Sequence, residues 1–425
     1  MKCFSFSYGE KKDEFKTTKS LSVKSNTSTF TENEMRRSGS GFNSQNISDT
    51  SMESVGRSSF PSFSQRSSDL KVFTFQELKT ATKNFSRSAM LGEGGFGCVY
   101  RGLIKNPEDS TQKMDIAVKK LGGRGLQGHK EWVTEVNVLG IVEHPNLVKL
   151  VGYCADEDER GMQRLLIYEY MPNGSVEQQL FSRTLPPLPW VARLKVAHQS
   201  ASGLAYLHEG MDFQIIFRDF KSSNILLDEN WNAKLSDFGM ARLGPTDGLS
   251  HVSTAIVGTM GYAAPEYLQT GHLTYKTDVW SYGVFIYELI TGRRALDRHK
   301  PKSEQKLLEW VRPYLSDPKK FRLIIDPRLE GKYTLKSVQK LAIIANRCLV
   351  KNHKSRPKMS EVVEMINRIV GPSAGNVSPQ LPLLKMSLSV ESADGKRDSN
   401  KRSNSDLGAS SWLSRMWTPK LLRSC

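Results

Sequence analysis

The chain has 425 residues, of which 38% are hydrophobic, and a formal net charge of +16 from 60 Lys and Arg against 44 Asp and Glu. No run of 18 apolar residues predicts a membrane span, and five scattered cysteines without a C-x-x-C pair predict neither a disulfide framework nor a zinc site. The basic excess fits a nucleic acid, an anionic membrane surface or neither, and because no nucleic-acid-binding motif accompanies it, we expect no nucleic-acid partner.

Composition divides the chain into four parts. Residues 1–71 and 371–425 are polar and rich in serine, so they bury too little apolar surface to offset the entropy of ordering them. We therefore expect a disordered N-terminal arm over 1–71, a flanking helix within 72–84, a folded domain over 85–370 and a flexible basic tail over 371–425.

The first predicted element is a short helix before the folded domain. Thr74 and Glu77 have the spacing of a capping box, and Phe73 and Leu78 have that of a hydrophobic staple, so a helix is expected over 75–83. Short β-like runs and one amphipathic run follow. The expected strands are 99–103, 115–119, 147–153 and 164–170, the expected helix is 129–142, and the acidic segment 156–160 is expected to be a solvated loop.

The rest of the chain is mainly helical from about residue 176. Helices are expected over 190–209, 278–291, 307–315, 335–349 and 359–369. A β-rich first part and a helical second part predict an α+β fold with an N-terminal lobe over 85–171 and a C-terminal lobe over 172–370.

A glycine-rich segment opens the folded domain. Gly92, Gly94 and Gly97 form the pattern G-x-G-x-x-G, which lets a backbone approach phosphates closely. A dinucleotide-binding turn uses the same spacing but needs a helix after it, whereas a β-like run follows here, so we expect a hairpin that covers a nucleotide. The predicted nucleotide-binding residues of this segment are Leu91, Gly92, Glu93, Gly94, Gly95, Phe96, Gly97, Cys98 and Val99.

Lys119 ends an apolar strand and is a candidate to neutralise the α- and β-phosphates. A lone lysine there would simply reach water from the edge of a sheet, so the functional interpretation requires an acidic partner. Glu131 and Glu135 are four residues apart and share a helix face. We assign Glu135, on the more apolar side, as the partner and expect Glu131 to be a solvated surface charge.

Two further motifs supply candidate catalytic groups. Asp219 can accept a proton from an attacking hydroxyl, Lys221 can stabilise charge on a transferred phosphoryl group, and Asn224 can hold a metal ion. Asp237, followed by Phe and Gly, would also bind Mg²⁺, which prefers carboxylate and amide oxygens with water.

These motifs, in this order, resemble those of the eukaryotic protein kinases over about residues 85–370. The resemblance implies ATP and Mg²⁺ as cofactors and protein substrates, and Lys221 follows the serine/threonine-kinase pattern. It places Ala117 and Tyr168 beside the adenine, with the backbone of Glu169 and Met171 bonded to the base. It also implies a structural ion pair between Glu266 and Arg356 and a brace on the catalytic loop from Asp278.

A narrower similarity is to the plant receptor-like cytoplasmic kinases of subfamily VII. This similarity rests on the segments 73–78, 81–82, 84–86, 166–175, 251–254 and 261–267. It implies a kinase that acts below plasma-membrane receptor kinases in immunity or development, as a monomer or in transient complexes.

One position departs from the family pattern, because Phe217 stands where most kinases carry His. The resemblance places it in a packed column with Leu139, Leu150 and Phe238, and an aromatic side chain can preserve that packing. Arg218 is retained and could bind a phosphate on the following loop. The candidate regulatory phosphorylation sites are Thr254, then Ser253, and also Thr259, which the resemblance places at the substrate-side wall.

The main alternative is a kinase-fold scaffold, a pseudokinase that binds receptor complexes without catalysis. It predicts the loss of Lys119, Asp219, Asn224 or Asp237, and all four are present. A nucleic-acid binder is a third possibility, which a salt-dependent shift assay would test.

The two ends bear on localisation. Position 2 is Lys rather than the Gly of an N-myristoylation signal, while Cys3, near several lysines, is a lipidation candidate. An ordinary flexible arm is the other interpretation for Cys3. The apolar and basic residues before Cys425 fit interfacial membrane contact or packing on the folded domain, and the sequence does not decide whether Cys3 or Cys425 is acylated. We expect peripheral association with the cytoplasmic face of the plasma membrane, with cytosolic or nuclear pools.

Overall fold

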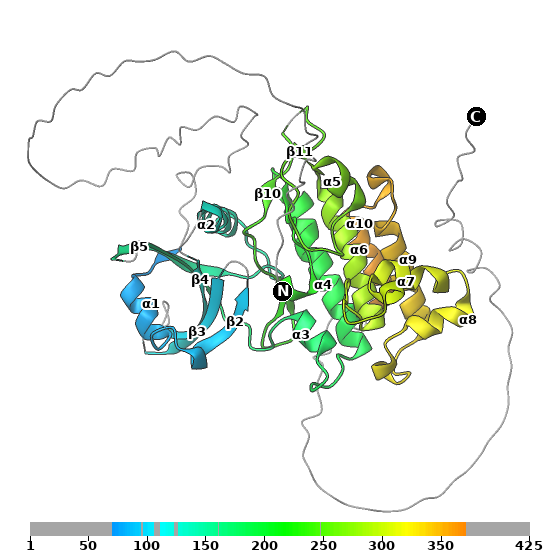
Figure 1. The fold of residues 1–425 in the computed structure, drawn as a ribbon, viewed down its shortest axis with the longest axis horizontal. Coiled ribbons are helices and arrows are strands. Elements are labelled where there is room, and N and C mark those ends of the chain that lie inside the picture. Colours follow the sequence, from blue (N-terminus) through cyan, green and yellow to red (C-terminus); the bar gives the residue numbers. More distant parts are fainter. Residues whose placement is uncertain are drawn as a thin grey trace, which may run out of the picture. The chain divides into compact units, whose positions relative to one another are not determined.

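The computed structural model describes residues 70–94, 97–105, 111–122, 126–159, 161–246 and 248–370. A six-stranded sheet forms the N-terminal lobe and helices dominate the C-terminal lobe, so the predicted bilobal α+β fold is confirmed (Figure 1). Almost all of the predicted N-terminal arm, and the whole tail over 371–425, lie outside the described residues. Among the described residues, none of the helices is both long and apolar enough to span a bilayer.

The sheet of the N-terminal lobe has the strand order β1-β5-β6-β4-β3-β2. Only the β1–β5 pair is parallel. The strands are β1 (Lys71–Val72), β2 (Met90–Gly94), β3 (Gly97–Lys105), β4 (Lys113–Leu121), β5 (Leu150–Asp158) and β6 (Gly161–Glu169).

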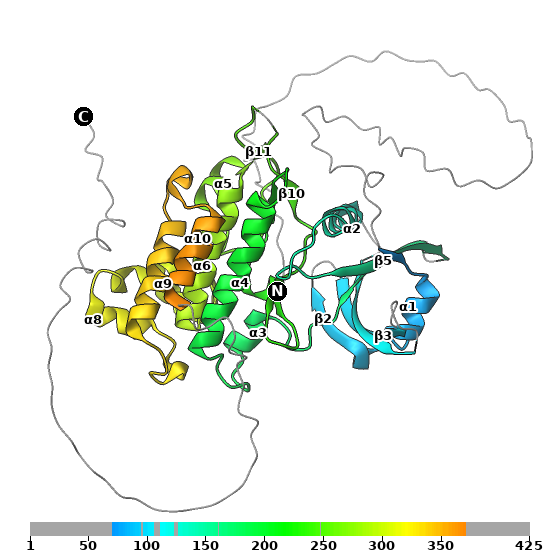
Figure 2. The same ribbon diagram turned by 180° about the vertical axis from the view of Figure 1, so that it is seen from behind.

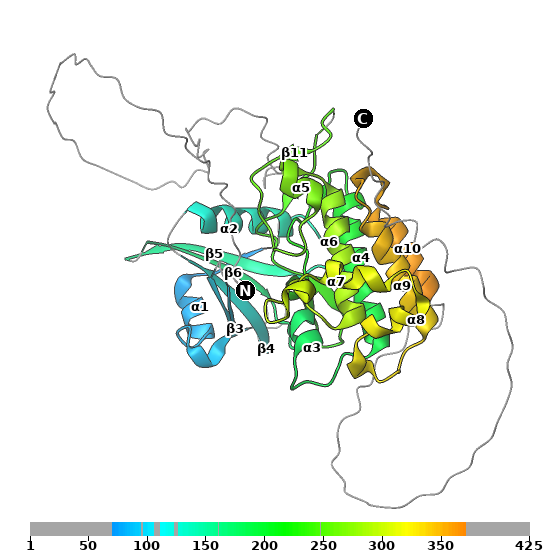
Figure 3. The same cartoon turned by 45° about the vertical axis from the view of Figure 1, so that its right-hand side comes forward.

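Two helices cover opposite faces of this sheet, α1 (Phe75–Ala81) on one side and α2 (Leu126–Leu139) on the other (Figure 3). The alternation of side chains along β6 explains how both faces are filled. Leu165 and Ile167 belong to the small core below α1, whereas Leu166 belongs to the main core that includes the apolar side of α2. The predicted capping box of α1 is confirmed, since Thr74 accepts from the backbone N–H of Glu77 and Glu77 accepts from that of Thr74.

The expectation of a solvated loop over 156–160 is wrong. Strands β5 and β6 continue through most of it as a hairpin, in which Asp156 lies opposite Gln163. The Asp156 carboxylate accepts a hydrogen bond from the backbone N–H of Phe75 at 2.6 Å, at the first turn of α1. A run of charges hides the strand periodicity, and the partner of Asp156 lies 81 residues away, so the sequence pattern alone misleads here.

The C-terminal lobe is built around α6, most of whose residues are buried. Figure 2 shows α6 beside α4 and α9. The helices are α3 (Val176–Phe181), α4 (Trp190–Glu209), α5 (Pro265–Thr270), α6 (Tyr275–Thr291), α7 (Leu307–Val311), α8 (Pro318–Phe321), α9 (Leu335–Cys348) and α10 (Met359–Val370). The short strands are β7 (Ile215–Ile216), β8 (Ile225–Leu227), β9 (Ala233–Leu235), β10 (Arg242–Leu243), β11 (Val252–Ser253) and β12 (His272–Leu273).

The helix expected over 307–315 is shorter than predicted. It ends as α7 at Val311 and continues as a 3₁₀ turn over Arg312–Tyr314. Pro313 lies in that turn and lacks the N–H that an α-helix needs. The sequence pattern also missed α3 and α5, which have six residues each and are too short to show a helical period.

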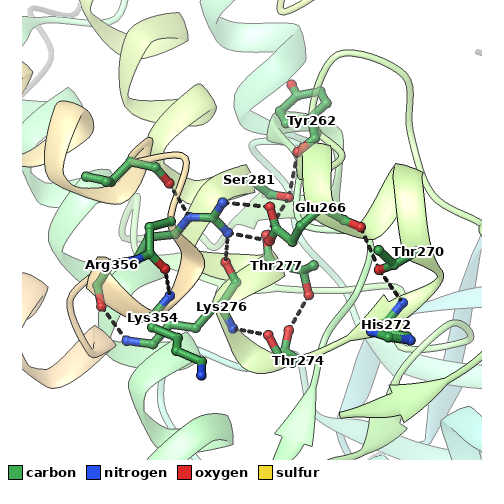
Figure 4. Close-up of polar contacts among 12 residues, drawn as sticks. Tyr262, Glu266, Thr270, His272, Thr274, Lys276, Thr277, Ser281, Lys354 and Arg356 are labelled. Atoms are coloured by element: carbon green, nitrogen blue, oxygen red, sulfur yellow. Dashed lines mark hydrogen bonds and ion pairs between the residues drawn. The ribbon is translucent and has the colours of Figure 1, made fainter. Parts of the chain in front are cut away.

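The ion pair expected between Glu266 and Arg356 is confirmed (Figure 4). The guanidinium of Arg356, 2% exposed, donates to the two carboxylate oxygens of Glu266 at 2.6 and 2.7 Å. It also donates to the backbone carbonyl of Lys276 at 2.8 Å. These bonds tie the start of α5 to the start of α6 and to the segment before α10.

Candidate active site

A cavity of about 590 Å³ is lined by residues of both lobes. It gathers most of the residues singled out in the sequence, although these come from five separate segments. Those that line it are Leu91, Gly92, Glu93, Gly94, Gly97, Val99, Ala117, Lys119, Tyr168, Glu169, Met171, Lys221, Asn224 and Asp237. Gly95 and Phe96 lie outside the described residues.

The glycine-rich segment is the β2–β3 hairpin, as its spacing predicts. Gly92 pairs with Val99 and Gly94 with Gly97. Gly97 has φ of +139°, and a Cβ there would lie 2.0 Å from the backbone oxygen of Lys120, so only glycine fits. A Cβ at Gly92 or Gly94 would meet nothing within 4 Å, which leaves the backbone open on the cavity side.

Lys119 lies between two carboxylates. Its ammonium donates to Glu135 Oε1 at 2.5 Å and to Asp237 Oδ1 at 2.7 Å. Burial disfavours the charged lysine, but the carboxylates of Asp237 and Glu135 outweigh it and raise the pKa of Lys119. The ammonium therefore stays charged at neutral pH and links α2 of one lobe to the Asp237 segment of the other.

Glu131 is buried, so the expectation that it is a solvated surface charge is wrong. Its side chain is 2% exposed, and a Cβ at Gly239 would come within 3.1 Å of it. Glu131 and Glu135 lie one turn apart and both face the segment that follows Asp237. The choice of Glu135 as the partner of Lys119 nevertheless agrees with the geometry.

Tyr168 makes a contact that the sequence pattern does not indicate. It lines the cavity, and its buried hydroxyl donates to Glu135 Oε2. Burial raises the pKa of Glu135, and this bond and the Lys119 ion pair each satisfy one of its two oxygens. No local signal could have shown the contact, because the partners are 33 residues apart.

Asp219 is held by three neighbours. Lys221 Nζ donates to Oδ2 at 2.6 Å, Thr259 Oγ1 donates to Oδ1 at 2.7 Å, and Asn224 Nδ2 donates to the backbone oxygen at 3.0 Å. Lys221 also reaches Thr259 Oγ1 at 3.0 Å. Asp219 thus lies beside the cavity, oriented by two residues that line it and by the loop before α5.

The loop that carries Asp219 is braced from below by Asp278. The buried carboxylate of Asp278 accepts the backbone N–H groups of Phe217 and Arg218, both at 2.8 Å, which confirms the expected brace. Arg218 has a φ of +74°, an uncommon value outside glycine that these bonds hold in place. The ring of Phe217 packs edge-on to Phe238, with centroids 5.0 Å apart.

Asn224 and Asp237 could hold a divalent cation between them. Both line the cavity, and together they offer an amide oxygen and a carboxylate. The Asn224 amide nitrogen donates to Asp219, which leaves its oxygen as the group to coordinate metal. Although burial opposes its charge, Lys119 holds the pKa of Asp237 below its usual value, so Asp237 is an anion at neutral pH.

The candidate phosphorylation sites lie along one segment. Arg218 Nη2 donates to Thr254 Oγ1 at 2.9 Å and to the backbone oxygen of Ala255 at 2.5 Å. Ser253 is exposed in β11, and Thr259 bonds Asp219 and Lys221. Cys3 and Cys425 lie outside the described residues.

Comparisons with known proteins agree with this geometry. A profile for protein tyrosine and serine/threonine kinases matches residues 85–366. "Serine/threonine-protein kinase PCRK1" of Arabidopsis thaliana is 64% identical over 427 residues, which cover 100% of both chains. "Serine/threonine-protein kinase PCRK2" of the same plant is 62% identical over 429 residues, again over 100% of both. "Receptor-like cytoplasmic kinase 176" of Oryza sativa subsp. japonica is 48% identical over 339 residues, or 78% of this chain and 84% of that protein.

Proposed function

Because this chain belongs to the protein kinase family and is a serine/threonine kinase, we propose that it relays signals from a plasma-membrane receptor by phosphorylating other proteins. One observation carries the site assignment. Lys119 bridges Glu135 and Asp237 at the cavity into which Lys221 and Asn224, both bonded to Asp219, also project. The alternative of a non-catalytic scaffold has no support, since none of these groups is missing.

The nucleotide-binding roles follow from which groups face the cavity. The hairpin over residues 91–99 would cover ATP, with Ala117 beside the adenine and Lys119 at the phosphates. The N–H of Glu169 donates to Lys149, and the carbonyl of Met171 accepts from Gly174. We therefore assign the Glu169 carbonyl and the Met171 N–H to the base. Asn224 and Asp237 would hold Mg²⁺, which neutralises phosphate charge when bound.

Asp219 orients the attacking hydroxyl and accepts its proton. Lys221 supplies positive charge to the transferred group, and Thr259 holds Asp219 Oδ1 in place. The experiment is transfer of label from [γ-³²P]ATP by the purified full-length chain to a generic protein substrate. Label on serine and threonine that disappears with EDTA would support the proposal, and labelled tyrosine alone would contradict it.

Phosphorylation of Thr254 is the proposed activating step. The Thr254 hydroxyl already accepts a hydrogen bond from the Arg218 guanidinium at 2.9 Å, so a phosphate on Thr254 would lie beside a cation. Thr254→Ala is expected to lower kcat at least about tenfold, because one charge-assisted hydrogen bond is worth about 1.5–3 kcal/mol. The neighbouring Ser253→Ala is the control and should change less. Unchanged turnover in Thr254→Ala would reject this role.

The proposed location is the cytoplasmic face of the plasma membrane, with Cys3 as the lipidation candidate and plant defence as the pathway class. It rests on the similarity to receptor-like cytoplasmic kinases and on the lysines near Cys3. Cys3→Ser, Cys425→Ser and the double variant would be compared by membrane fractionation. We expect Cys3→Ser to shift the protein to the soluble fraction, and a double variant that stays on membranes would contradict lipidation.

A further inference from the structure

The segment of residues 71–86, here called the N-terminal flank, is part of the N-terminal lobe although all but its last two residues precede the kinase-profile match at 85. Its strand β1 pairs with β5, where Lys71 lies opposite Gly152, and Phe73 N–H donates to Tyr153 O at 2.9 Å. Phe73 and Leu78, 1% and 0% exposed, share a core with residues of β4 and β6. The flank is therefore packed on the sheet face opposite α2.

The flank ends in an uncommon backbone turn. Lys83, Asn84 and Phe85 have φ values of +52°, +61° and +52°, and each such residue other than glycine costs about 1–2 kcal/mol. Buried Thr82 holds the turn, because its hydroxyl oxygen accepts the Phe85 N–H at 3.1 Å. Lys79 O accepts the Asn84 N–H at 2.7 Å. The result is that the chain reverses and the Phe85 ring stacks on Phe75, with centroids 5.6 Å apart.

The two stacked rings contact a lysine directly next to Lys119. Lys120 Nζ lies 4.6 Å from the centroid of Phe85 and 5.2 Å from that of Phe75, within the range of cation–π attraction. Side chains alternate along a strand, so Lys119 points to the cavity and Lys120 to the flank. Phe85 also packs edge-on to buried Tyr100 of β3, with centroids 5.3 Å apart, and Tyr100 is adjacent to the cavity residue Val99.

We propose that Phe75 and Phe85 form an aromatic clamp on Lys120 that positions Lys119 and the glycine-rich hairpin for nucleotide binding. The clamp holds β4 at Lys120 and β3 at Tyr100, directly behind the strand residues that face the phosphates. These are positioning residues, since none of them lines the cavity. This inference rests on the proposed function and assigns the flank a part in it.

The geometry of Lys119 explains why a remote contact matters. Its ammonium bonds two carboxylates from different segments, at 2.5 and 2.7 Å, so a displacement of β4 would change both contacts at once. Binding groups work within about 0.5 Å of their productive positions. Loosening the clamp should therefore weaken nucleotide binding before it unfolds the lobe.

The test is a double-mutant cycle on the full-length chain with Lys120→Met, Phe85→Leu and both together. The readouts are the Kd for a non-hydrolysable ATP analogue with Mg²⁺, the KM for ATP and kcat. All are measured at a temperature below the melting temperature of every variant. Each single variant is expected to weaken nucleotide binding about three- to tenfold, as one cation–π contact allows, with kcat within about twofold. The double variant should lose less affinity than the sum of the two single losses, because both changes remove the Lys120–Phe85 contact.

Controls separate positioning from general damage. Lys113→Met changes an exposed lysine at the other end of β4 and should leave both constants unaltered. Lys120→Arg keeps the charge and Phe85→Tyr keeps the ring, so both should bind the nucleotide as the wild type does. They also serve as the tested variants if Lys120→Met or Phe85→Leu does not fold. Unchanged nucleotide affinity, or additive losses in the double variant, would overturn the clamp. A wild-type chain that binds the analogue through the clamp but transfers no phosphate would instead contradict the proposed function alone.

Discussion

Replacing Asp219 with asparagine is expected to lower kcat about a thousandfold while leaving the affinity for ATP nearly unchanged. Asparagine keeps the shape of the side chain, and its single amide oxygen can still accept from Lys221, but it cannot take the proton of an attacking hydroxyl. Asp219 does not line the nucleotide cavity, so nucleotide binding should not report the change. Steady-state kinetics with a generic protein substrate would measure both constants.

Asp212→Asn is the matched control for this prediction. Asp212 is an exposed carboxylate shortly before β7 and should tolerate the change with kcat within about twofold, as for most surface substitutions. If Asp219→Asn kept more than about a tenth of wild-type turnover, the general-base role would be wrong.

Replacing Lys119 with methionine is expected to reduce kcat/KM by about a hundred- to a thousandfold. Among the described residues, this ammonium is the one cation bonded to both Glu135 and Asp237, so its loss leaves two carboxylates near each other without compensation. Such an uncompensated buried charge also costs about 3–5 kcal/mol of stability. Kinetics and thermal unfolding of the same preparations would separate the two effects.

Glu135→Gln and the double variant Lys119→Met with Glu135→Gln provide a further test of this second prediction. The glutamine removes one carboxylate, so stability in the double variant should recover part of the loss seen in Lys119→Met, while activity should not. An active Lys119→Met chain with the melting temperature of the wild type would show that the bridge is dispensable.

The sequence was informative where a motif carries its own geometry. Gly97 had to be glycine because the Lys120 carbonyl leaves no room for a side chain, and the order of the motifs that contain Lys119, Asn224 and Asp237 indicated one shared cavity. The capping box of α1 was predictable for the same reason, since both of its partners lie within four residues.

The missed features depend on partners that are distant in the chain. Glu131 looks like a surface charge in a helix pattern, and only the approach of Gly239 shows that it is buried. The Tyr168 hydroxyl and the Asp156 carboxylate find partners 33 and 81 residues away. Helical or strand periodicity describes one element at a time and contains no information about such contacts.

The close approach at Gly152 has a practical consequence for protein production. A Cβ there would lie 2.0 Å from Lys71 O, so glycine at this position of β5 allows the N-terminal flank to pack against the strand. A recombinant fragment that begins at residue 85, where similarity to kinases starts, would lack the strand that pairs with β5 and would expose the apolar surface that Phe73 and Leu78 cover. Such a fragment is expected to aggregate, so the shortest soluble catalytic fragment should begin before Lys71.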